Sequence, residues 1–329
     1  MKNIAILATG GTIAGASHIP TDTVSYHSGV VPIEDILKEI GSLKNIANII
    51  CEQVTQIDSA DMSHAIWLSL AKRINTLLAQ PDIDGIVVTH GTDTLEETAY
   101  FLNLVIKSEK PVVLVGAMRP STAISPDGPM NLYNAIILAA YPGTQGKGVL
   151  VTLNDTINCS RDVTKTNTAL QDTFKAPELG YLGYIIDGHP HFYRMPTRKH
   201  THMTEFTIDG LIELPPVEVL YGHVNDTGFL AQAAVTAGAK GIVYAGLGNG
   251  NMSQTMQTVF QQIAQQGVII VRGSRVGSGV VTRNGAIDDD ANNFVVTDTL
   301  SPQKARILLM LALTKTKNPK EIQEMFWNY

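Results

Sequence analysis

The sequence carries little charge, only two cysteines and no long apolar run. Charged residues make up 16% of the 329 residues and leave a formal net charge of −6. This balance argues against nucleic-acid binding, which needs an excess or a cluster of basic side chains. Cys51 and Cys159 have neither zinc-site nor redox-pair spacing, and their surroundings are typical of small buried hydrophobic residues. The longest apolar stretches, such as residues 307–313, are far shorter than a membrane span.

The first residues bear on the compartment. The apolar run at residues 4–7 meets glycines by residue 10. Such a run is too short for the apolar region of a signal peptide and predicts a buried first strand instead. We therefore expect a cytoplasmic protein, with the periplasm left open if a leader has been removed.

The chain does contain an alternation of strand-like and helix-like segments. Short, continuously apolar runs rich in β-branched residues are typical of buried parallel strands. They occur at residues 4–7, 86–89, 112–115 and 149–153. Helical spacing of apolar residues occurs at 63–80 and 131–140. This alternation predicts an α/β fold with a parallel sheet and right-handed crossovers.

A polar, basic and proline-broken stretch at residues 189–202 interrupts the alternation, as a linker would. Beyond it, strands are expected at 217–220, 241–244 and 268–271, and helices at 227–237, 253–266, 302–315 and after 319. A chain of this length is expected to form about two domains. We predict a larger N-terminal catalytic α/β domain (1–190), a linker (191–212) and a smaller Rossmann-like α/β domain (213–329).

Ligands of parallel sheets bind beyond the carboxyl ends of the strands, so the loops there are the first candidates for chemistry. The first loop reads LATGGTIAG (7–15). Paired glycines let a ligand approach backbone N–H groups, yet the spacing of a phosphate-binding loop is absent. Thr9 and Thr12 therefore either shape the turn or supply a nucleophile. The polar stretch 16–31 is typical of a flexible active-site lid, and its phenol, Tyr26, could close over a substrate.

Two later loops add hydroxyl, carboxylate and amine groups. THGTDT (89–94) sets a hydroxyl beside a carboxylate, which suits a proton acceptor or an ammonium anchor next to a nucleophile. The alternative is a turn stabilised by its own side chains, with His90 a packed, hydrogen-bonded residue. In RDVTKTNT (161–168), Lys165 is either solvated, as most lysines are, or partly buried and able to accept a proton from threonine.

Two further features have competing interpretations. The histidines at 189, 191, 200 and 202 lack a nearby acidic or cysteine partner, which favours a surface loop over a metal site. LGNGNM (247–252) is a turn before a helix, or Asn251 contributes to a ligand site.

Taken together, LATGGTIAG and GIVVTHGTDTLEE (85–97) resemble the bacterial L-asparaginase family, and the likeness covers essentially the whole chain. It is nearest to the type II branch. The other matching motifs are KPVVLVGAMRPSTAISPDGPMNLYNA (110–135), RDVTKTNT, GNGN (248–251) and LSPQKARILLMLALTKT (300–316). The resemblance implies a two-domain α/β fold, a homotetramer made of two close dimers, and hydrolysis of L-asparagine to L-aspartate and ammonia with no metal or cofactor.

The resemblance also implies catalytic roles. Thr12 would be the nucleophile that attacks the side-chain amide, with Tyr26 of the lid close to its hydroxyl. Lys165 and Asp93 would polarise Thr92, which activates the deacylating water or assists the first attack.

Substrate-binding roles follow in the same way. Ser59 and Asp93 would hold the substrate's carboxylate and ammonium groups, and the backbone of Ala117 would contact the leaving amide. Asn251 would reach the site of a neighbouring subunit. The glycines of TGGT would then let a carbonyl approach Thr12, with backbone N–H groups stabilising the oxyanion.

The sequence departs from the family pattern beside Ser59 and near the C-terminal domain's acidic loop. Ala60 replaces a glutamine or glutamate that often touches the ammonium group, and Ala286 replaces a glutamate from the neighbouring subunit. Asp58 could supply the missing charge, and Asp288 lies close to Ala286. Losing a charge-assisted hydrogen bond costs about 1.5–3 kcal/mol, so we expect a preference for asparagine over glutamine.

The cysteine pair of some periplasmic relatives has no counterpart, because Gln80 or Pro81 and Ser108 occupy the matching positions. This supports a reducing compartment. Four alternatives remain: a dual glutaminase-asparaginase, an amidase subunit acting on transfer-RNA-linked glutamine, a non-catalytic amino-acid sensor and a nucleotide-binding protein. Each of the last three is disfavoured by a feature that it requires. The amidase subunit would need a basic face, and the sensor should have lost Thr12, Thr92 or Lys165. The nucleotide-binding protein would need a phosphate-binding motif.

Overall fold

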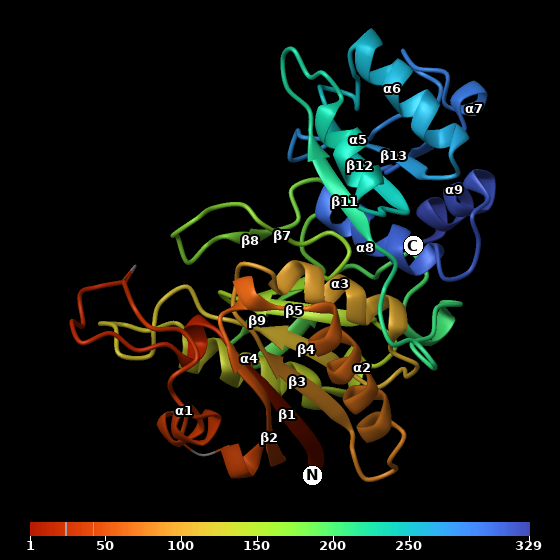
Figure 1. Cartoon of the computed structure of the whole chain (residues 1–329). Coiled ribbons are helices and arrows are strands. Elements are labelled where there is room, and N and C mark those ends of the chain that lie inside the picture. The colour runs from red at the N-terminus through yellow and green to blue at the C-terminus, as the bar shows by residue number, and fades with distance from the viewer. Residues whose placement is uncertain (24, 42) are drawn as a thin grey trace. The chain divides into compact units, whose positions relative to one another are not determined.

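The computed structural model describes residues 1–23, 25–41 and 43–329. These residues form two compact units, Met1–Gly210 and Leu211–Tyr329, which Figure 1 colours from red to green and from green to blue. Each unit is an α/β body with its own sheet. The first unit therefore continues to Gly210, twenty residues beyond the expected limit of 190.

The described residues of the first unit form an eight-stranded mixed sheet in the order β10-β9-β6-β5-β4-β3-β1-β2. The strands β1, β2, β3, β4 and β5 run parallel to one another, as expected. Each remaining strand is antiparallel to its neighbour: β6 to β5, β9 to β6 and β10 to β9. The strands are β1 Lys2–Gly10, β2 Ala47–Ile57, β3 Gly85–Thr89, β4 Val112–Val115, β5 Val149–Leu153, β6 Thr156–Cys159, β9 Gly183–Ile186 and β10 His189–Phe192.

The antiparallel edge comes from two tight hairpins. The turns are Asn154-Asp155 and Asp187-Gly188, and all four residues have φ between 50° and 74°. Such pairs suit the type of two-residue turn that matches the twist of the flanking strands. The stretch expected as the start of a linker, from residue 189, is therefore the edge strand β10.

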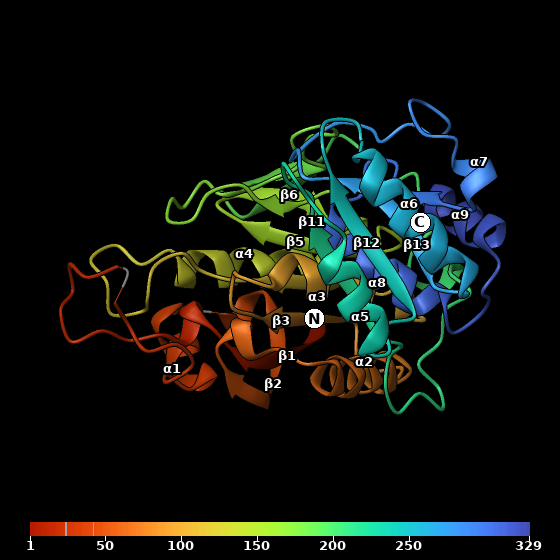
Figure 2. The ribbon, with the colours of Figure 1, turned by 45° about the horizontal axis from the view of Figure 1, so that its top comes forward.

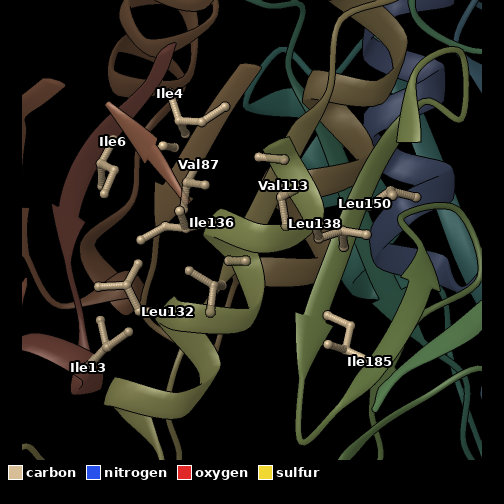
Figure 3. Packing of buried hydrophobic residues seen from close by; sticks show 14 of the residues in the cluster. Ile4, Ile6, Ile13, Val87, Val113, Leu132, Ile136, Leu138, Leu150 and Ile185 are labelled. Carbon is tan, nitrogen blue, oxygen red and sulfur yellow. The ribbon is translucent and has the colours of Figure 1, made fainter. Parts of the chain in front are cut away.

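Helices cover both faces of this sheet (Figure 2). They are α1 Ile33–Glu39, α2 His64–Leu78, α3 Leu95–Val105 and α4 Gly128–Ala140. On one face, alternate strand residues pack against α4, as Figure 3 shows for Ile6, Val87, Val113, Leu132 and Ile136. The intervening strand residues are equally buried, because α2 and α3 contact the strands from the other side.

The second unit has a four-stranded parallel sheet in the order β11-β12-β13-β14, with helices packed against it. Its strands are β11 Val217–Tyr221, β12 Gly241–Gly246, β13 Ile269–Ser274 and β14 Val295–Val296. Its helices are α5 Phe229–Thr236, α6 Gln254–Gln265, α7 Asp289–Asn292, α8 Pro302–Ala312 and α9 Pro319–Asn328. The predicted elements of this half are confirmed to within a few residues. Asn318 caps α9, because its side chain accepts a hydrogen bond from the Lys320 N–H.

Cys159 is buried, as expected. Cys51 is half-buried, and burial raises the pKa of its thiol to about 11. Within the part of the chain that the structure describes, no helix combines the length and the apolarity needed to cross a bilayer.

Candidate active site

The glycine pair of the first loop lets two backbone segments touch. Gly10 and Gly11 have φ of 103° and 81°, which favour glycine. A Cβ at Gly11 would lie 2.2 Å from the Cα and N atoms of Gly91. The loop after β1 and the loop after β3 are therefore in direct backbone contact.

The two threonines that flank this pair make different contacts. The Thr9 hydroxyl donates to the carbonyl of Thr89 at 2.8 Å and so ties the end of β1 to the end of β3. Thr12 is 5% exposed, begins a short 3-10 helix (η1, Thr12–Ala14) and lies 2.7 Å from Tyr26, hydroxyl to hydroxyl. The Gly11 N–H donates to the Ile57 carbonyl at 2.9 Å, so this amide is already used and is not one of the expected oxyanion donors.

The loop expected to be a lid is closed at its base. Ala16 and His27 exchange two backbone hydrogen bonds of 3.0 Å, and the Gly29 N–H donates to the Gly11 carbonyl at 3.0 Å. Val24 of this loop lies outside the described residues. The loop's flexibility stays a prediction.

Burial raises the pKa of the Tyr26 phenol, against the opposite effect of its bond to Thr12. The carboxylates of Asp93, Asp58 and Asp127 add to the rise. Tyr26 is therefore a neutral phenol at pH 7, able both to donate a hydrogen bond and to accept one.

The second and third loops meet at Lys165. This lysine lies in β7 (Thr164–Lys165), which pairs only with β8 (Phe174–Lys175) among the described strands. Its Nζ lies 2.9 Å from Thr92 Oγ1 and 2.6 Å from Asp93 Oδ1. The lysine side chain is 17% exposed and that of Asp93 is 62% exposed, so the amine is mostly buried while its acidic partner faces outward. The solvated alternative for Lys165 is therefore wrong.

Ser59 is attached to the same loop. Its buried hydroxyl accepts a hydrogen bond from the Asp93 N–H at 3.2 Å, and its carbonyl accepts one from the Thr94 hydroxyl at 2.8 Å. Asp58 caps the turn that follows, because its Oδ1 accepts the Ala60 N–H at 2.9 Å. Asp58 also acts electrostatically on Tyr26, which places its charge near the first loop.

Ala117 is buried next to the same cluster. A Cβ at its neighbour Gly116 would lie 3.1 Å from Thr92 Cγ2. The two backbone N–H groups after Ala117 donate to the carboxylate of Asp127, each at 2.9 Å. Sequence reasoning missed Asp127, although its position just before the glycine that starts α4 is a common place for a polar turn residue.

His90 is the packed, hydrogen-bonded residue that was expected. Its Nδ1 lies 2.7 Å from the Gly91 carbonyl and must donate, because a carbonyl only accepts. Its Nε2 then accepts from the Thr98 hydroxyl at 2.8 Å, which itself accepts the Trp67 Nε1–H at 2.8 Å. Burial lowers the pKa of His90 to about 4, so the ring is neutral at pH 7.

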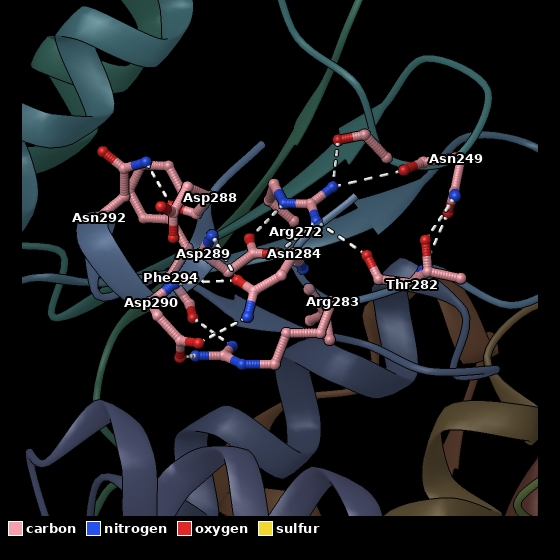
Figure 4. Close-up of polar contacts among 12 residues, drawn as sticks. Asn249, Arg272, Thr282, Arg283, Asn284, Asp288, Asp289, Asp290, Asn292 and Phe294 are labelled. Carbon is pink, nitrogen blue, oxygen red and sulfur yellow. Dashed lines mark hydrogen bonds and ion pairs between the residues drawn. The ribbon is translucent and has the colours of Figure 1, made fainter. Parts of the chain in front are cut away.

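Asn251 belongs to the second unit, on an exposed turn where it exchanges two backbone bonds with Leu247. Beneath the turn, the buried guanidinium of Arg272 donates to the Gly250 carbonyl at 2.9 Å and pairs with Asp289 at 2.6 Å (Figure 4). Ala286 is exposed. Asp288 caps α7 by accepting the Ala291 N–H at 2.9 Å.

The four histidines do not gather. His189 and His191 are exposed on β10, His200 is buried against Thr201, and His202 lies 3.2 Å from Glu109. Across the described ranges, no group of three or more histidine, cysteine or acidic side chains is arranged to hold a metal ion.

The fold and these contacts define a class of protein. Thr12, beside a neutral phenol, and Thr92, beside a lysine and a carboxylate, lie in two loops that follow parallel strands and touch one another. A hydroxyl beside proton-transfer groups is the arrangement of an acyl-transfer enzyme.

The particular family follows from sequence comparison. The family model "Asparaginase, N-terminal" matches residues 3–198, and "Glutaminase/Asparaginase C-terminal domain" matches residues 216–326. The chain belongs to the asparaginase family. It is therefore an amidohydrolase, which confirms the resemblance seen in its motifs.

Named relatives agree over the whole chain. It is 54% identical to L-asparaginase 2 of Bacillus subtilis and 50% identical to L-asparaginase 2 of Escherichia coli, covering all of this chain and 87% and 94% of those proteins. It is 47% identical to a glutaminase-asparaginase of Pseudomonas fluorescens, again over the full chain and 91% of that protein. The crystal structure of a probable cytoplasmic L-asparaginase from Campylobacter jejuni matches with a TM-score of 0.97, 48% identity and full coverage of both chains.

Proposed function

We propose that this protein is an L-asparaginase that hydrolyses L-asparagine to L-aspartate and ammonia, with Thr12 as the nucleophile. One observation carries the proposal: Thr12, paired with Tyr26, and Thr92, clustered with Lys165 and Asp93, lie on two loops whose backbones touch at Gly11 and Gly91. Relatives of about 50% identity that are named L-asparaginase 2 support the choice of substrate.

In the first half of the reaction, Thr12 Oγ1 bonds to the side-chain amide carbon. Its proton passes to Tyr26 as Tyr26 gives its own proton to the amide nitrogen, which leaves as ammonia. The 2.7 Å contact and the raised pKa of Tyr26 suit this relay, because the phenol is neutral before and after the transfer. An ester between Thr12 and an aspartyl group remains.

In the second half, water bonds to the ester carbon and Thr12 leaves with a proton. Thr92 and Lys165, whose polar atoms are 2.9 Å apart, take the proton of the water and return one to Thr12. Asp93 keeps the lysine amine in place at 2.6 Å. This order assigns the two hydroxyl clusters to acylation and deacylation.

The substrate's α-carboxylate and α-ammonium groups would be held by Ser59 and Asp93, and its amide by the backbone at Ala117. Asn251 would come from a neighbouring subunit of a homotetramer of close dimers. Sedimentation or light scattering tests the assembly, and a monomer with full activity would exclude a site shared between subunits.

The direct test is ammonia release from L-asparagine by the wild type and by Thr12→Ala. Removing a catalytic nucleophile costs about 10⁶-fold in kcat. Thr9→Val serves as the matched control, since it removes the neighbouring hydroxyl that only ties two strand ends. If Thr12→Ala keeps more than a tenth of the activity, Thr12 is not the nucleophile.

A dual glutaminase-asparaginase is the second candidate, since a relative at 47% identity carries that name. We favour asparagine because Ala60, an exposed residue beside Ser59, offers no side-chain hydrogen bond to the ammonium group. The ratio of kcat/KM for the two substrates decides, and equal values would remove the selectivity argument. A sensor would bind asparagine without releasing ammonia.

The cytoplasm remains our proposal for the compartment. The Campylobacter neighbour is named as a probable cytoplasmic enzyme, whereas a Haemophilus influenzae relative at 47% identity is named as a probable periplasmic one. Fractionation of cells that express the natural gene tests it, and recovery of the protein with periplasmic markers would overturn it.

A further inference from the structure

The first turn of α3 carries a buried carboxylate that no step above uses. Glu96 is 6% exposed. Its Oε1 accepts a hydrogen bond from the Thr164 hydroxyl at 3.0 Å and another from the backbone N–H of Lys165 at 3.3 Å. Glu96 thus binds the main chain of the residue whose amine reaches Thr92.

Lys165 is held at both ends by one short segment, the end of the loop after β3 and the first turn of α3. Asp93 lies in the loop just before α3, and Glu96, three residues further along the chain, lies in the first turn of the helix. Asp93 contacts the amine and Glu96 contacts the backbone of the same lysine. The four residues from Asp93 to Glu96 therefore contact both the amine and the backbone of the lysine.

The need for such a contact follows from where Lys165 lies. The β7–β8 hairpin forms a two-stranded sheet apart from the eight-stranded one, so the ladder of the main sheet does not set its position. A lysine also has four side-chain torsions between its backbone and its amine. Contacts outside the main sheet must fix its Cα if Nζ is to stay 2.9 Å from Thr92 Oγ1.

A carboxylate suits this position. The start of a helix stabilises negative charge, and a charged acceptor forms stronger hydrogen bonds to hydroxyl and N–H donors than a neutral one. A glutamine could still accept both bonds through its amide oxygen, whereas an alanine could accept neither. The two substitutions therefore separate loss of charge from loss of the contact.

We propose that Glu96 is a positioning residue that anchors the backbone of Lys165 and thereby sets the distance between the lysine amine and Thr92. This inference rests on the proposed function. Glu96 acts through Lys165 and does not touch the substrate. Its loss should slow the chemical steps and leave binding of asparagine nearly unchanged.

The experiment compares kcat and KM for asparagine in Glu96→Ala, Glu96→Gln and the control Glu97→Gln, which removes a charge from the same helical turn. A displacement of about 1 Å in a catalytic group costs about 100-fold. We expect kcat of Glu96→Ala to fall about 10–100-fold with KM within about two-fold, and Glu96→Gln to recover most of the loss. An unchanged kcat, or a loss confined to KM, would overturn the proposal.

A double-mutant cycle tests the route through Lys165. Adding Glu96→Ala to Lys165→Met should leave the residual kcat unchanged, because the group being positioned is already absent. A second, additive loss would mean that Glu96 acts elsewhere and would overturn the proposal. If Glu96→Ala does not fold, Thr164→Val replaces it, since that variant removes one of the two donors, and a kcat equal to the wild type would contradict the inference.

Hydrogen exchange separates this inference from the proposed function. The Lys165 amide should exchange faster in Glu96→Ala than in the wild type, whatever the substrate is. A wild type that releases no ammonia from asparagine would refute the proposed function, while faster exchange in the variant would still support the anchor. Unchanged exchange at Lys165 in an active enzyme would refute the anchor alone.

Discussion

The two units hold their functional loops by different means. In the first unit, the loops after β1 and β3 meet through close backbone contact at Gly11 and Gly91 and through the neutral hydrogen bond from the Thr9 hydroxyl to the Thr89 carbonyl. In the second, the turn that carries Asn251 rests on the buried Arg272–Asp289 ion pair, whose side chains are 2% and 0% exposed. Small residues bring the backbone segments of one unit together, while fully paired charges support the turn of the other.

The ion pair should give the largest effect on stability. Arg272→Met leaves the buried carboxylate of Asp289 without its charged partner and removes the bond to the Gly250 carbonyl. Breaking one side of a buried pair costs about 3–5 kcal/mol. Denaturant unfolding should show this loss, and a loss below about 1 kcal/mol would contradict the structural role given to the pair.

The matched control is the surface pair Lys38–Asp35, whose side chains are 76% and 54% exposed. Lys38→Met should leave the free energy of unfolding nearly unchanged, because solvent screens such pairs. A large loss of stability in Arg272→Met and almost none in Lys38→Met would identify burial of the ion pair as the cause of the difference.

The buried, uncharged ring of His90 in the first unit should make the stability depend on pH, with an effect of intermediate size. The pKa of His90 is lowered to about 4 in the folded protein, from 6.5 for the free side chain. The unfolded state therefore binds more protons between these values, and His90 opposes folding increasingly as the pH falls from 6.5 to 4. At about 1.36 kcal/mol per pKa unit, this pKa shift lowers the free energy of unfolding by an amount on the order of 3 kcal/mol at low pH.

Unfolding curves at pH 7 and pH 4.5 measure this effect as the difference between the wild type and His90→Asn. The asparagine can keep the donor to the Gly91 carbonyl but does not titrate, so its stability should fall less on acidification. His189→Asn, at an exposed histidine on β10, is the control and should behave as the wild type does. Equal pH dependence in wild type and His90→Asn would rule out this contribution.

The smallest expected effect concerns the preference for asparagine over glutamine, and two substitutions test which unit sets that preference. Ala60→Gln restores a polar group beside Ser59, and Ala286→Glu restores an acid in the second unit. A charge-assisted hydrogen bond is worth about 1.5–3 kcal/mol, or one to two decades in kcat/KM for glutamine.

Ala60→Leu controls for side-chain size in that comparison. If only Ala60→Gln raises glutamine turnover, the first unit sets selectivity, and if only Ala286→Glu does, the second unit does. No change with either substitution would show that neither position is responsible.

Some elements were hidden from sequence reasoning for identifiable reasons. Strand β2 lies at the edge of the sheet and alternates between half-buried and exposed residues, so it lacks the continuous apolar run of a central strand. Helix α3 is buried on nearly every side, which removes the apolar stripe that reveals a surface helix. Strand β10 was mistaken for a linker because His189 and Pro190 are typical of loops, although the Asp187-Gly188 turn before it was a hairpin signal.

The sequence by itself determined the parallel strands, the amphipathic helices and the order of the polar loops, because apolar periodicity and turn residues act locally along the chain. Only the tertiary structure decided which side chains meet. Thr92 and Lys165 are 73 residues apart, and the Glu96 contact to Lys165 spans 69. The order of strands in the sheet and the packing of α3 bring such distant groups within hydrogen-bonding distance, and no local pattern encodes that separation. The tautomer of His90 has the same origin, since it is set by a carbonyl on one side and a threonine of α3 on the other.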